Sequence, residues 1–286
     1  MPVYHALSPA KINFTLEIVG RRPDGFHDLR MLMQTIALSD TLTLSIAPGH
    51  GVSLRTSSAS LPTDQTNLAV RAALFFLEAA RLDAAIALHL DKRIPVGAGL
   101  GGGSSNAACV LKTLNEHFQY PLDEDTMAAL ALRLGSDIPF FLRGGLQYAQ
   151  GRGERLIPLP PLPPCYLVLC KPDYGIATAQ AFHTYAHGGF VPPAPLTVQA
   201  LQAAQHKDLP ALGQSLFNQL EPALSALHQA DQAAIHAVFQ KHGALGDALS
   251  GSGPTHFGLF ADESHAQNAA ETLSKQWNHV FFTRPV

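Results

Sequence analysis

Hydrophobic and polar residues alternate along the opening of the chain. In residues 10–19 every second position is apolar, and most of the positions between are polar. A period of two is typical of a half-buried strand. A turn signature over residues 20–25 contains Pro, Asp and Gly, and strand-like runs are predicted after it at 29–36 and 41–47. The chain is therefore expected to open as a β-sheet.

Helical spacing replaces this alternation from residue 67 onward. Asn67 and Asp123 are suitable N-cap residues, because their side chains can accept hydrogen bonds from the free amides of a first helical turn. The predicted elements are a helix from Asn67 to about Leu82, a strand over 86–90, a helix from Ser105 to about Phe118 and a helix from Asp123 to about Leu134. These helices are expected to cover the sheet.

A proline-rich segment between Pro158 and Pro164 reads PLPPLPP, which can continue neither a helix nor a central strand. It is predicted to join two domains, 1–157 and 158–286, and a length of 286 residues fits two domains. The second domain is expected to contain a strand over 166–170, helices within 197–242, two strands around a turn over 247–260, and a helix over 262–276.

Composition narrows the class of protein. Hydrophobic residues make up 47% of the chain, charged residues 14%, and the mean hydropathy is +0.08, which is typical of a globular protein. Because the net charge is −3 and the cationic residues are scattered, we expect no nucleic-acid partner. The chain has no run of 18 apolar residues and no secretory leader pattern, so neither membrane insertion nor secretion is expected.

Cysteine and histidine positions indicate neither a disulfide framework nor a metal site. Cys109, Cys165 and Cys170 are odd in number and lack metal-type spacing, which fits a reducing cytoplasm. The 14 histidines form no HExxH-like cluster. We therefore expect a cytoplasmic protein without a protein-bound metal.

A glycine-rich loop is the most informative chemical feature. It comprises Pro95, Val96, Gly97, Ala98, Gly99, Leu100, Gly101, Gly102, Gly103, Ser104 and Ser105, with five glycines between 97 and 103. Glycine lets backbone amides crowd around a ligand, and the N-terminus of the following helix favours negative charge. The loop is predicted to hold a polyphosphate, and a flexible hinge is the alternative.

Other nucleotide-binding patterns fit this loop poorly. The stretch 97–102 satisfies GxGxxG, but a dinucleotide fold needs a second strand ending in an acid about 20 residues on, where helices are predicted here. The chain contains no GxxxxGK[ST], VAIK or HRD element. A dehydrogenase, a P-loop enzyme and a protein kinase are therefore disfavoured.

Two residues are candidates for catalysis. Lys11 projects from the polar face of the first strand together with Asn13, and a solvated surface lysine is the alternative interpretation. Asp137 precedes an apolar run, and a carboxylate there could accept the proton of a hydroxyl. Helix capping by Ser136 or Asp137 is the alternative.

Three motifs together resemble those of the GHMP kinases: PAKIN at 9–13, PVGAGLGGGSSNAA at 95–108 and LSGSGPT at 249–255. Taken alone, the third is also consistent with a simple tight turn. The resemblance implies an α+β fold of two domains, the first like ribosomal protein S5 domain 2 and the second a GHMP-kinase α+β domain, with the active site in the cleft between them.

The resemblance also implies roles for individual residues. Lys11 and Asp137 would be the catalytic pair, with Asp137 taking the proton of the acceptor hydroxyl and Lys11 stabilising charge. Residues 95–105 would bind ATP, which brings Mg²⁺ with it as a co-substrate, and Asn67 would lie at the adenine side. No tightly bound cofactor is expected, and the protein is expected to be a monomer or a weak homodimer.

Two further stretches, RRPDGFHDL at 21–29 and GSDIPFFL at 135–142, resemble the branch whose acceptor is a cytidine diphosphate-linked alcohol of the non-mevalonate isoprenoid route. By that resemblance Asn13, Phe26 and His27 would bind the acceptor. Phe26 stands where the family often has tyrosine. A second ring to stack on cytosine, Phe182 or Tyr185, stays open.

Two alternatives remain at this stage. The chain could be another GHMP kinase that acts on mevalonate, homoserine or a sugar, or a nucleotide-binding protein without catalysis. The pair Phe26 and His27 argues for a cytidine-containing acceptor, and the presence of both Lys11 and Asp137 argues for catalysis.

Overall fold

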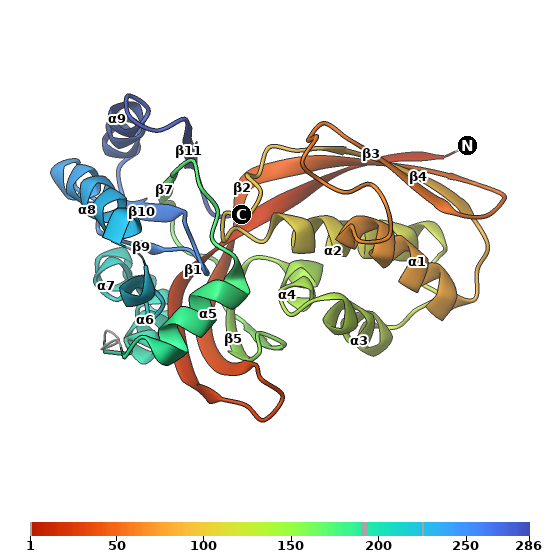
Figure 1. Ribbon diagram of the computed structural model, residues 1–286, viewed down its shortest axis with the longest axis horizontal. Helices are drawn as coiled ribbons and strands as arrows, with labels where there is room; N and C mark the ends of the chain where they lie inside the picture. The colour runs from red at the N-terminus through yellow and green to blue at the C-terminus, as the bar shows by residue number, and fades with distance from the viewer. Residues whose placement is uncertain (1, 190–193, 225) are drawn as a thin grey trace. The chain divides into compact units, whose positions relative to one another are not determined.

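The computed structural model describes residues 2–189, 194–224 and 226–286 and divides into two compact units (Figure 1). Unit 1 holds the chain up to Ala10, Leu38–Ile94 and Gly101–Gly144. Unit 2 holds Lys11–Ala37, Pro95–Leu100 and the chain from Gly145 on. Because the chain passes between the units several times, this division does not follow a single break, and a domain join near 158 stays a prediction.

Unit 1 is a sheet covered by helices. Its strands are β3 (Val52–Thr56), β4 (Ala85–Asp91) and parts of the long strands β1 (Val3–Arg21) and β2 (His27–Ala47), and its helices are α1 (Leu68–Ala80), α2 (Gly102–His117), α3 (Glu124–Leu134) and α4 (Ile138–Arg143). Figure 1 shows α1 and α2 lying along one face of β3 and β4. Leu42, Leu44 and Phe76 are among its buried side chains, and each such side chain contributes about 1.5–3 kcal/mol to folding.

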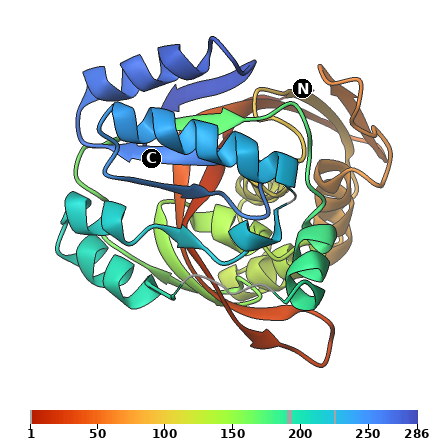
Figure 2. The ribbon, with the colours of Figure 1, turned by 60° about the vertical axis from the view of Figure 1, so that its left-hand side comes forward.

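Unit 2 contains a second, four-stranded sheet. The order of its strands is β11 (His279–Thr283), β7 (Tyr166–Lys171), β10 (His256–Phe260) and β9 (Gly246–Leu249), all antiparallel. Helices α8 (Ala226–Lys241) and α9 (Glu263–Leu273) lie side by side over it (Figure 2). Phe239 of α8 and Leu273 of α9 are fully buried in the core that these elements share.

The rest of unit 2 extends the first sheet and adds short helices. Strand β5 pairs with β2 and β6, and β8 pairs in parallel with β1. The bounds of these elements are β5 (Leu146–Gly151), β6 (Arg155–Pro158), β8 (Phe217–Asn218), α5 (Thr178–His187), α6 (Thr197–Gln205), α7 (Leu209–Gln214) and a 3₁₀ turn, η1 (Glu221–Ala223). Among the described residues, no helix is long and apolar enough to cross a bilayer.

Most of the predicted elements are confirmed. Asn67 caps α1 by accepting a hydrogen bond from the amide of Ala69 at 2.9 Å, and Asp123 caps α3 through Thr126 at 2.8 Å. The prediction of two separate strands over 29–47 is wrong, because β2 runs without a break from His27 to Ala47. Sequence analysis also missed the short strands β3, β5, β6, β8 and β11 and the helix α5. These elements were missed because their apolar periodicity is weak.

The predicted start of the helix after the glycine loop is also wrong. Helix α2 begins at Gly102 and not at Ser105. Gly101 acts as its N-cap with a φ of 69°, a left-handed conformation that glycine adopts without steric cost. The amide of Ser105 donates to the carbonyl of Gly101 at 2.9 Å. The last part of the loop is therefore the first turn of the helix.

Candidate active site

Lys11 is not a solvated surface residue. Its side chain is 4% exposed, and its Nζ donates to Oδ1 of Asn13 at 2.7 Å. Asn13 is fully buried on β1 and also donates from Nδ2 to the sulfur of Met31 at 3.3 Å. Burial of an ammonium is costly without partners, so the interpretation of Lys11 as a solvated surface lysine is wrong.

Parts of the three sequence motifs meet within unit 2. The amide of Lys11 donates to the carbonyl of Leu100 at 3.0 Å, and the hydroxyl of Ser250 donates to the carbonyl of Gly99 at 3.1 Å. A Cβ placed on Gly251 would lie 3.0 Å from the carbonyl oxygen of Gly99 and 3.2 Å from Nζ of Lys11. The segment at 249–255 is therefore a tight turn that packs on the glycine loop, and not a turn alone.

Gly99 shows why this loop needs glycine. Its φ is +76°, and a Cβ there would collide with the carbonyl oxygen of Ser250 and lie 3.0 Å from the amide nitrogen of Gly253. Gly97 also has a positive φ, but a Cβ there would meet only the Cα of Gly175, at 3.9 Å. At Gly99, therefore, the backbone of the loop lies directly against the backbone of the turn at 249–255.

The helix-side end of the loop lies in unit 1, where the N-termini of α1 and α2 are close. A Cβ on Gly103 would lie 3.6 Å from a methyl group of Leu68. The side-chain amide of Asn67, next to Leu68, makes hydrogen bonds at both ends. Its Oδ1 accepts from the amide of Ala69, and its Nδ2 donates to the carbonyl of Pro62 at 2.9 Å. Helix N-termini carry partial positive charge, which suits the phosphates of a nucleotide.

Asp137 stands at the N-cap position of α4, with no side-chain hydrogen bond to the first amides of that helix. Pro139 is the second residue of α4 and offers no amide hydrogen. The side chain of Asp137 therefore does not cap α4. A role of Asp137 in proton transfer stays a prediction.

Three rings gather at the turn between β1 and β2 in unit 2. The Phe26 ring is 48% exposed, and the guanidinium of Arg152 lies 3.7 Å from its centroid. The His27 ring stacks on Phe182 at a centroid distance of 4.9 Å and an interplanar angle of 21°. Burial, and secondarily the charge of Arg21, lowers the pKa of His27. This favours the neutral imidazole, which can both donate and accept hydrogen bonds.

Comparisons with known proteins identify the family of the chain. The GHMP kinases N terminal domain matches residues 67–145, and the GHMP kinases C terminal domain matches residues 200–279. A protein of Pelotomaculum thermopropionicum named 4-diphosphocytidyl-2-C-methyl-D-erythritol kinase is 41% identical over 283 residues, which cover 99% of this chain and 98% of that protein. The chain belongs to the GHMP kinase family. The resemblance stated from the motifs is thereby confirmed.

Other relatives of this GHMP kinase have the same name or the same fold. A protein of the same name from Acaryochloris marina is 41% identical over 286 residues, covering 96% of this chain and 92% of that protein. The crystal structure of a 4-(cytidine 5'-diphospho)-2C-methyl-D-erythritol kinase matches with a TM-score of 0.80 and 36% identity, over 99% of both chains. A homoserine kinase from Cytophaga hutchinsonii has a TM-score of 0.78 at 19% identity, which shows the shared fold alone.

Sequence reasoning about this GHMP kinase left one side chain unassigned and missed another at the turn between β1 and β2 that carries Phe26 and His27, here called the aromatic turn. Phe182 was one of two open candidates, and its stacking on His27 distinguishes it from Tyr185. Arg152 lies in the turn that follows β5, and no local pattern connects it with Phe26. Within the described ranges, no three His, Cys, Asp or Glu side chains gather as metal ligands would.

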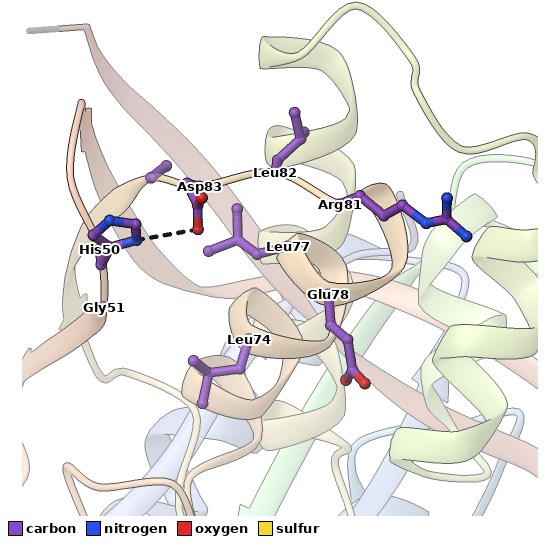
Figure 3. A pocket seen from close by; sticks show the side chains of 9 residues that line it. His50, Gly51, Leu74, Leu77, Glu78, Arg81, Leu82 and Asp83 are labelled. Carbon is purple, nitrogen blue, oxygen red and sulfur yellow. Dashed lines mark hydrogen bonds and ion pairs between the residues drawn. The ribbon is translucent and has the colours of Figure 1, made fainter.

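A separate cavity of about 460 Å³ lies in unit 1 at the C-terminal end of α1 (Figure 3). Its lining includes Leu74, Leu77 and the pair His50 and Asp83, whose Nδ1 and Oδ1 atoms are 3.1 Å apart. Helix α1 has 13 residues and therefore spans about 20 Å. Since Asn67 stands at its opposite end, this cavity is not part of the predicted nucleotide site.

The carboxylate of the half-buried Glu221 in η1 supports the turn at 249–255 and gives a pH-dependent prediction. Oε1 of Glu221 accepts a hydrogen bond from the amide of Leu249 at 2.8 Å, and burial, with the charge of Asp247, raises the pKa of Glu221 to about 7 from 4.5. The folded state thus holds a proton that the unfolded state loses, so stability falls as the pH rises from about 4.5 to 7.

Glu221→Gln is expected to remove this loss. Relative to the wild type, its free energy of unfolding should rise by up to about 3 kcal/mol between pH 5 and pH 8. Urea denaturation at the two pH values measures the change, with the exposed Glu271→Gln as the control. Parallel pH profiles for Glu221→Gln and the wild type would contradict the assignment.

Proposed function

We propose that this chain uses ATP to phosphorylate the 2-hydroxyl of 4-diphosphocytidyl-2-C-methyl-D-erythritol, a step of the non-mevalonate route to isoprenoid precursors. The observation that carries the proposal is the packing of Lys11, the glycine loop and the turn at 249–255 against one another, with 41% identity to relatives of that name. A GHMP kinase acting on another alcohol would share the loop but would not need the aromatic turn.

Asp137 is proposed as the base of the reaction. Transfer of the γ-phosphate to an alcohol needs the hydroxyl oriented and its proton accepted as the O–P bond forms. Lys11, whose Nζ is held by Asn13, is proposed to stabilise the negative charge that develops. A fixed ammonium can do this without reorganisation at the moment of reaction.

The glycine loop, residues 95–105, and Asn67 are proposed to bind ATP. Mg²⁺ would arrive with the nucleotide and neutralise charge on its phosphates. We propose a cytoplasmic monomer or weak homodimer that has no tightly bound cofactor and no nucleic-acid partner.

The aromatic turn is proposed to bind the cytidine end of the acceptor. Phe26 and Phe182 offer ring faces for stacking, and a neutral His27 can hydrogen-bond the edge of a base. Asn13 is proposed to bind the acceptor as well. In the structure its side-chain amide is buried and accepts a hydrogen bond from Lys11.

A coupled assay of ADP release tests the function. The purified protein is offered the cytidylyl alcohol, mevalonate and homoserine in parallel, with ATP and Mg²⁺. We expect turnover with the cytidylyl alcohol only. Efficient turnover with another acceptor would favour a different GHMP kinase, and calorimetric ATP binding without any turnover would favour a non-catalytic nucleotide-binding protein.

Phe26→Leu is expected to raise KM for the cytidylyl alcohol about tenfold or more, because stacking on a base is worth about 1–3 kcal/mol. KM for ATP should stay within about twofold, since the change is confined to the acceptor end. Steady-state kinetics with each substrate varied in turn measure both constants. Phe26→Tyr keeps the ring and serves as the control, so equal KM values for the Leu and Tyr variants would argue against stacking.

A further inference from the structure

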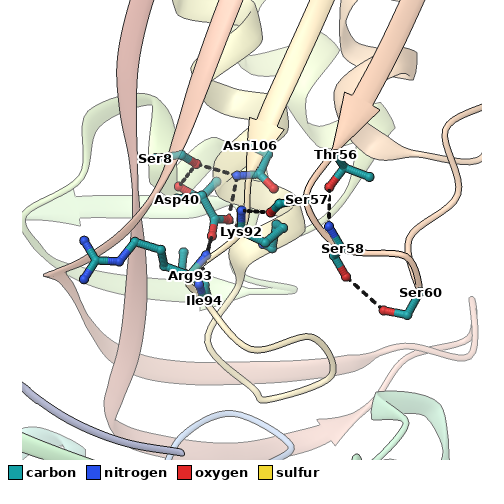
Figure 4. A network of polar contacts seen from close by, with 11 residues as sticks. Ser8, Asp40, Thr56, Ser57, Ser58, Ser60, Lys92, Arg93, Ile94 and Asn106 are labelled. Atoms are coloured by element: carbon teal, nitrogen blue, oxygen red, sulfur yellow. Dashed lines mark hydrogen bonds and ion pairs between the residues drawn. The ribbon is translucent and has the colours of Figure 1, made fainter.

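A buried carboxylate lies beneath both ends of the glycine loop in unit 1. Asp40 of β2 is fully buried, and Figure 4 shows its oxygens at the centre of a polar network. Oδ1 accepts hydrogen bonds from the amides of Arg93 at 2.8 Å and Ile94 at 2.9 Å, the last residues before the loop. Oδ2 accepts from Nδ2 of Asn106 on α2 at 2.9 Å. One side chain therefore ties the strand-side end of the loop to the helix-side end.

Lys92 balances the charge of this carboxylate. Its Nζ forms an ion pair with Oδ2 of Asp40, and its side chain is 8% exposed. A buried carboxylate without such a partner would be strongly unfavourable. The same ammonium lies against the start of α2, because a Cβ on Gly102 would be 3.1 Å from it. Glycine at this position leaves the space through which Lys92 reaches Asp40.

A second layer of contacts holds the first turns of α2. The hydroxyl of Ser8 donates to Oγ of Ser105 at 2.8 Å and accepts from Nδ2 of Asn106 at 2.9 Å. Ser105 and Asn106 are 2% and 3% exposed, respectively. Their side chains therefore point into unit 1, which leaves the backbone of the loop as the part that can face a ligand.

We propose that Asp40 is a positioning residue for ATP, an inference that rests on the proposed kinase function. Its carboxylate fixes the two ends of the loop at the separation at which the loop amides face the phosphates. A loop with five glycines has many accessible conformations, and anchoring its ends reduces the entropy lost when ATP binds. Asp40 acts through the loop and does not touch the nucleotide.

Asp40→Asn tests this role. The variant keeps the shape of the side chain but removes the charge that pairs with Lys92, and it places an amide among groups that all donate hydrogen bonds. We expect Kd for a non-hydrolysable ATP analogue, measured by calorimetry, to rise about tenfold or more, and KM for ATP to rise with it. KM for the acceptor and kcat should change by less than about threefold, a split that general destabilisation does not produce.

Two controls separate positioning from stability. Leu54→Ala opens a cavity in the core of unit 1 at a residue 7% exposed, and it should lower the melting temperature while keeping the Kd of the wild type. Ser57→Ala removes the hydroxyl that accepts from the amide of Lys92 at 2.9 Å, and it should also keep that Kd. Should Asp40→Asn fail to fold, Asn106→Ala removes the helix-side contact with Asp40, together with the contact with Ser8, and is expected to weaken binding in the same direction.

A folded Asp40→Asn or Asn106→Ala protein that binds the analogue as tightly as the wild type would overturn the proposal. The proposal would also be overturned if Leu54→Ala, at the same melting temperature as Asp40→Asn, lost as much affinity for the ATP analogue. The calorimetric measurement needs no acceptor, so it stays readable if the wild type does not phosphorylate the cytidylyl alcohol. That result would overturn the proposed function and leave the role of Asp40 in nucleotide binding to be decided separately.

Discussion

Asp137→Ala is expected to lower kcat by about 10²–10⁴-fold, the usual contribution of a positioned general base. The affinity for ATP should be almost unchanged, because the carboxylate is assigned to the acceptor hydroxyl and not to the nucleotide. Steady-state ADP release gives kcat, and calorimetry with a non-hydrolysable analogue gives Kd. The two readouts together separate loss of the base from loss of the nucleotide site.

The exposed acid Asp125, in the first turn of α3, provides a matched control for this experiment. Asp125→Ala removes the same charge from the same unit and should keep the kcat of the wild type. Near-normal turnover of Asp137→Ala would defeat the assignment of the base. The alternative explanation, loss of a helix cap, is already disfavoured, because Asp137 makes no capping hydrogen bond to α4.

Gly99→Ala is expected to raise KM for ATP by at least about tenfold. The added methyl group would collide with the carbonyl oxygen of Ser250, and overpacking of this kind costs about 1–3 kcal/mol or displaces the backbone. Since the loop is proposed to bind phosphates through its backbone, displacement should weaken nucleotide binding more than acceptor binding. Steady-state kinetics with ATP and the acceptor varied separately measure this difference.

Gly97→Ala is the control that separates backbone strain from the steric contact with Ser250. Both glycines have positive φ values, +64° and +76°, so both substitutions carry the strain of a left-handed residue. Only Gly99 faces a close backbone neighbour, whereas a Cβ on Gly97 meets nothing nearer than 3.9 Å. We expect the Gly97 variant to lose much less affinity for ATP. Equal losses would mean that strain, and not the contact with Ser250, sets the requirement for glycine.

The sequence of this protein determined its local structure well. Alternation over 10–19 predicted the strand β1, and Asn67 and Asp123 predicted two helix starts, because both signals depend on residues close together in the chain. The prediction that this strand is only half-buried is wrong, because Lys11, Asn13 and Thr15 on its polar face are buried as well. The glycine loop could also be recognised from the sequence, since its pattern lies in one continuous segment. Its binding of ATP stays a prediction. The motif resemblance to GHMP kinases added the catalytic residues Lys11 and Asp137, whose roles stay predictions.

Contacts between distant segments were decided only by the tertiary structure. The hydrogen bond from Arg93 to Asp40 joins residues 53 apart in the chain, and that from Ser250 to Gly99 joins residues 151 apart. Such pairs depend on strand pairing and on which face each residue presents, and neither can be read from a local pattern. For that reason the predicted ATP site could be derived from the sequence, whereas the buried carboxylate that we propose to anchor the loop appeared only in the fold.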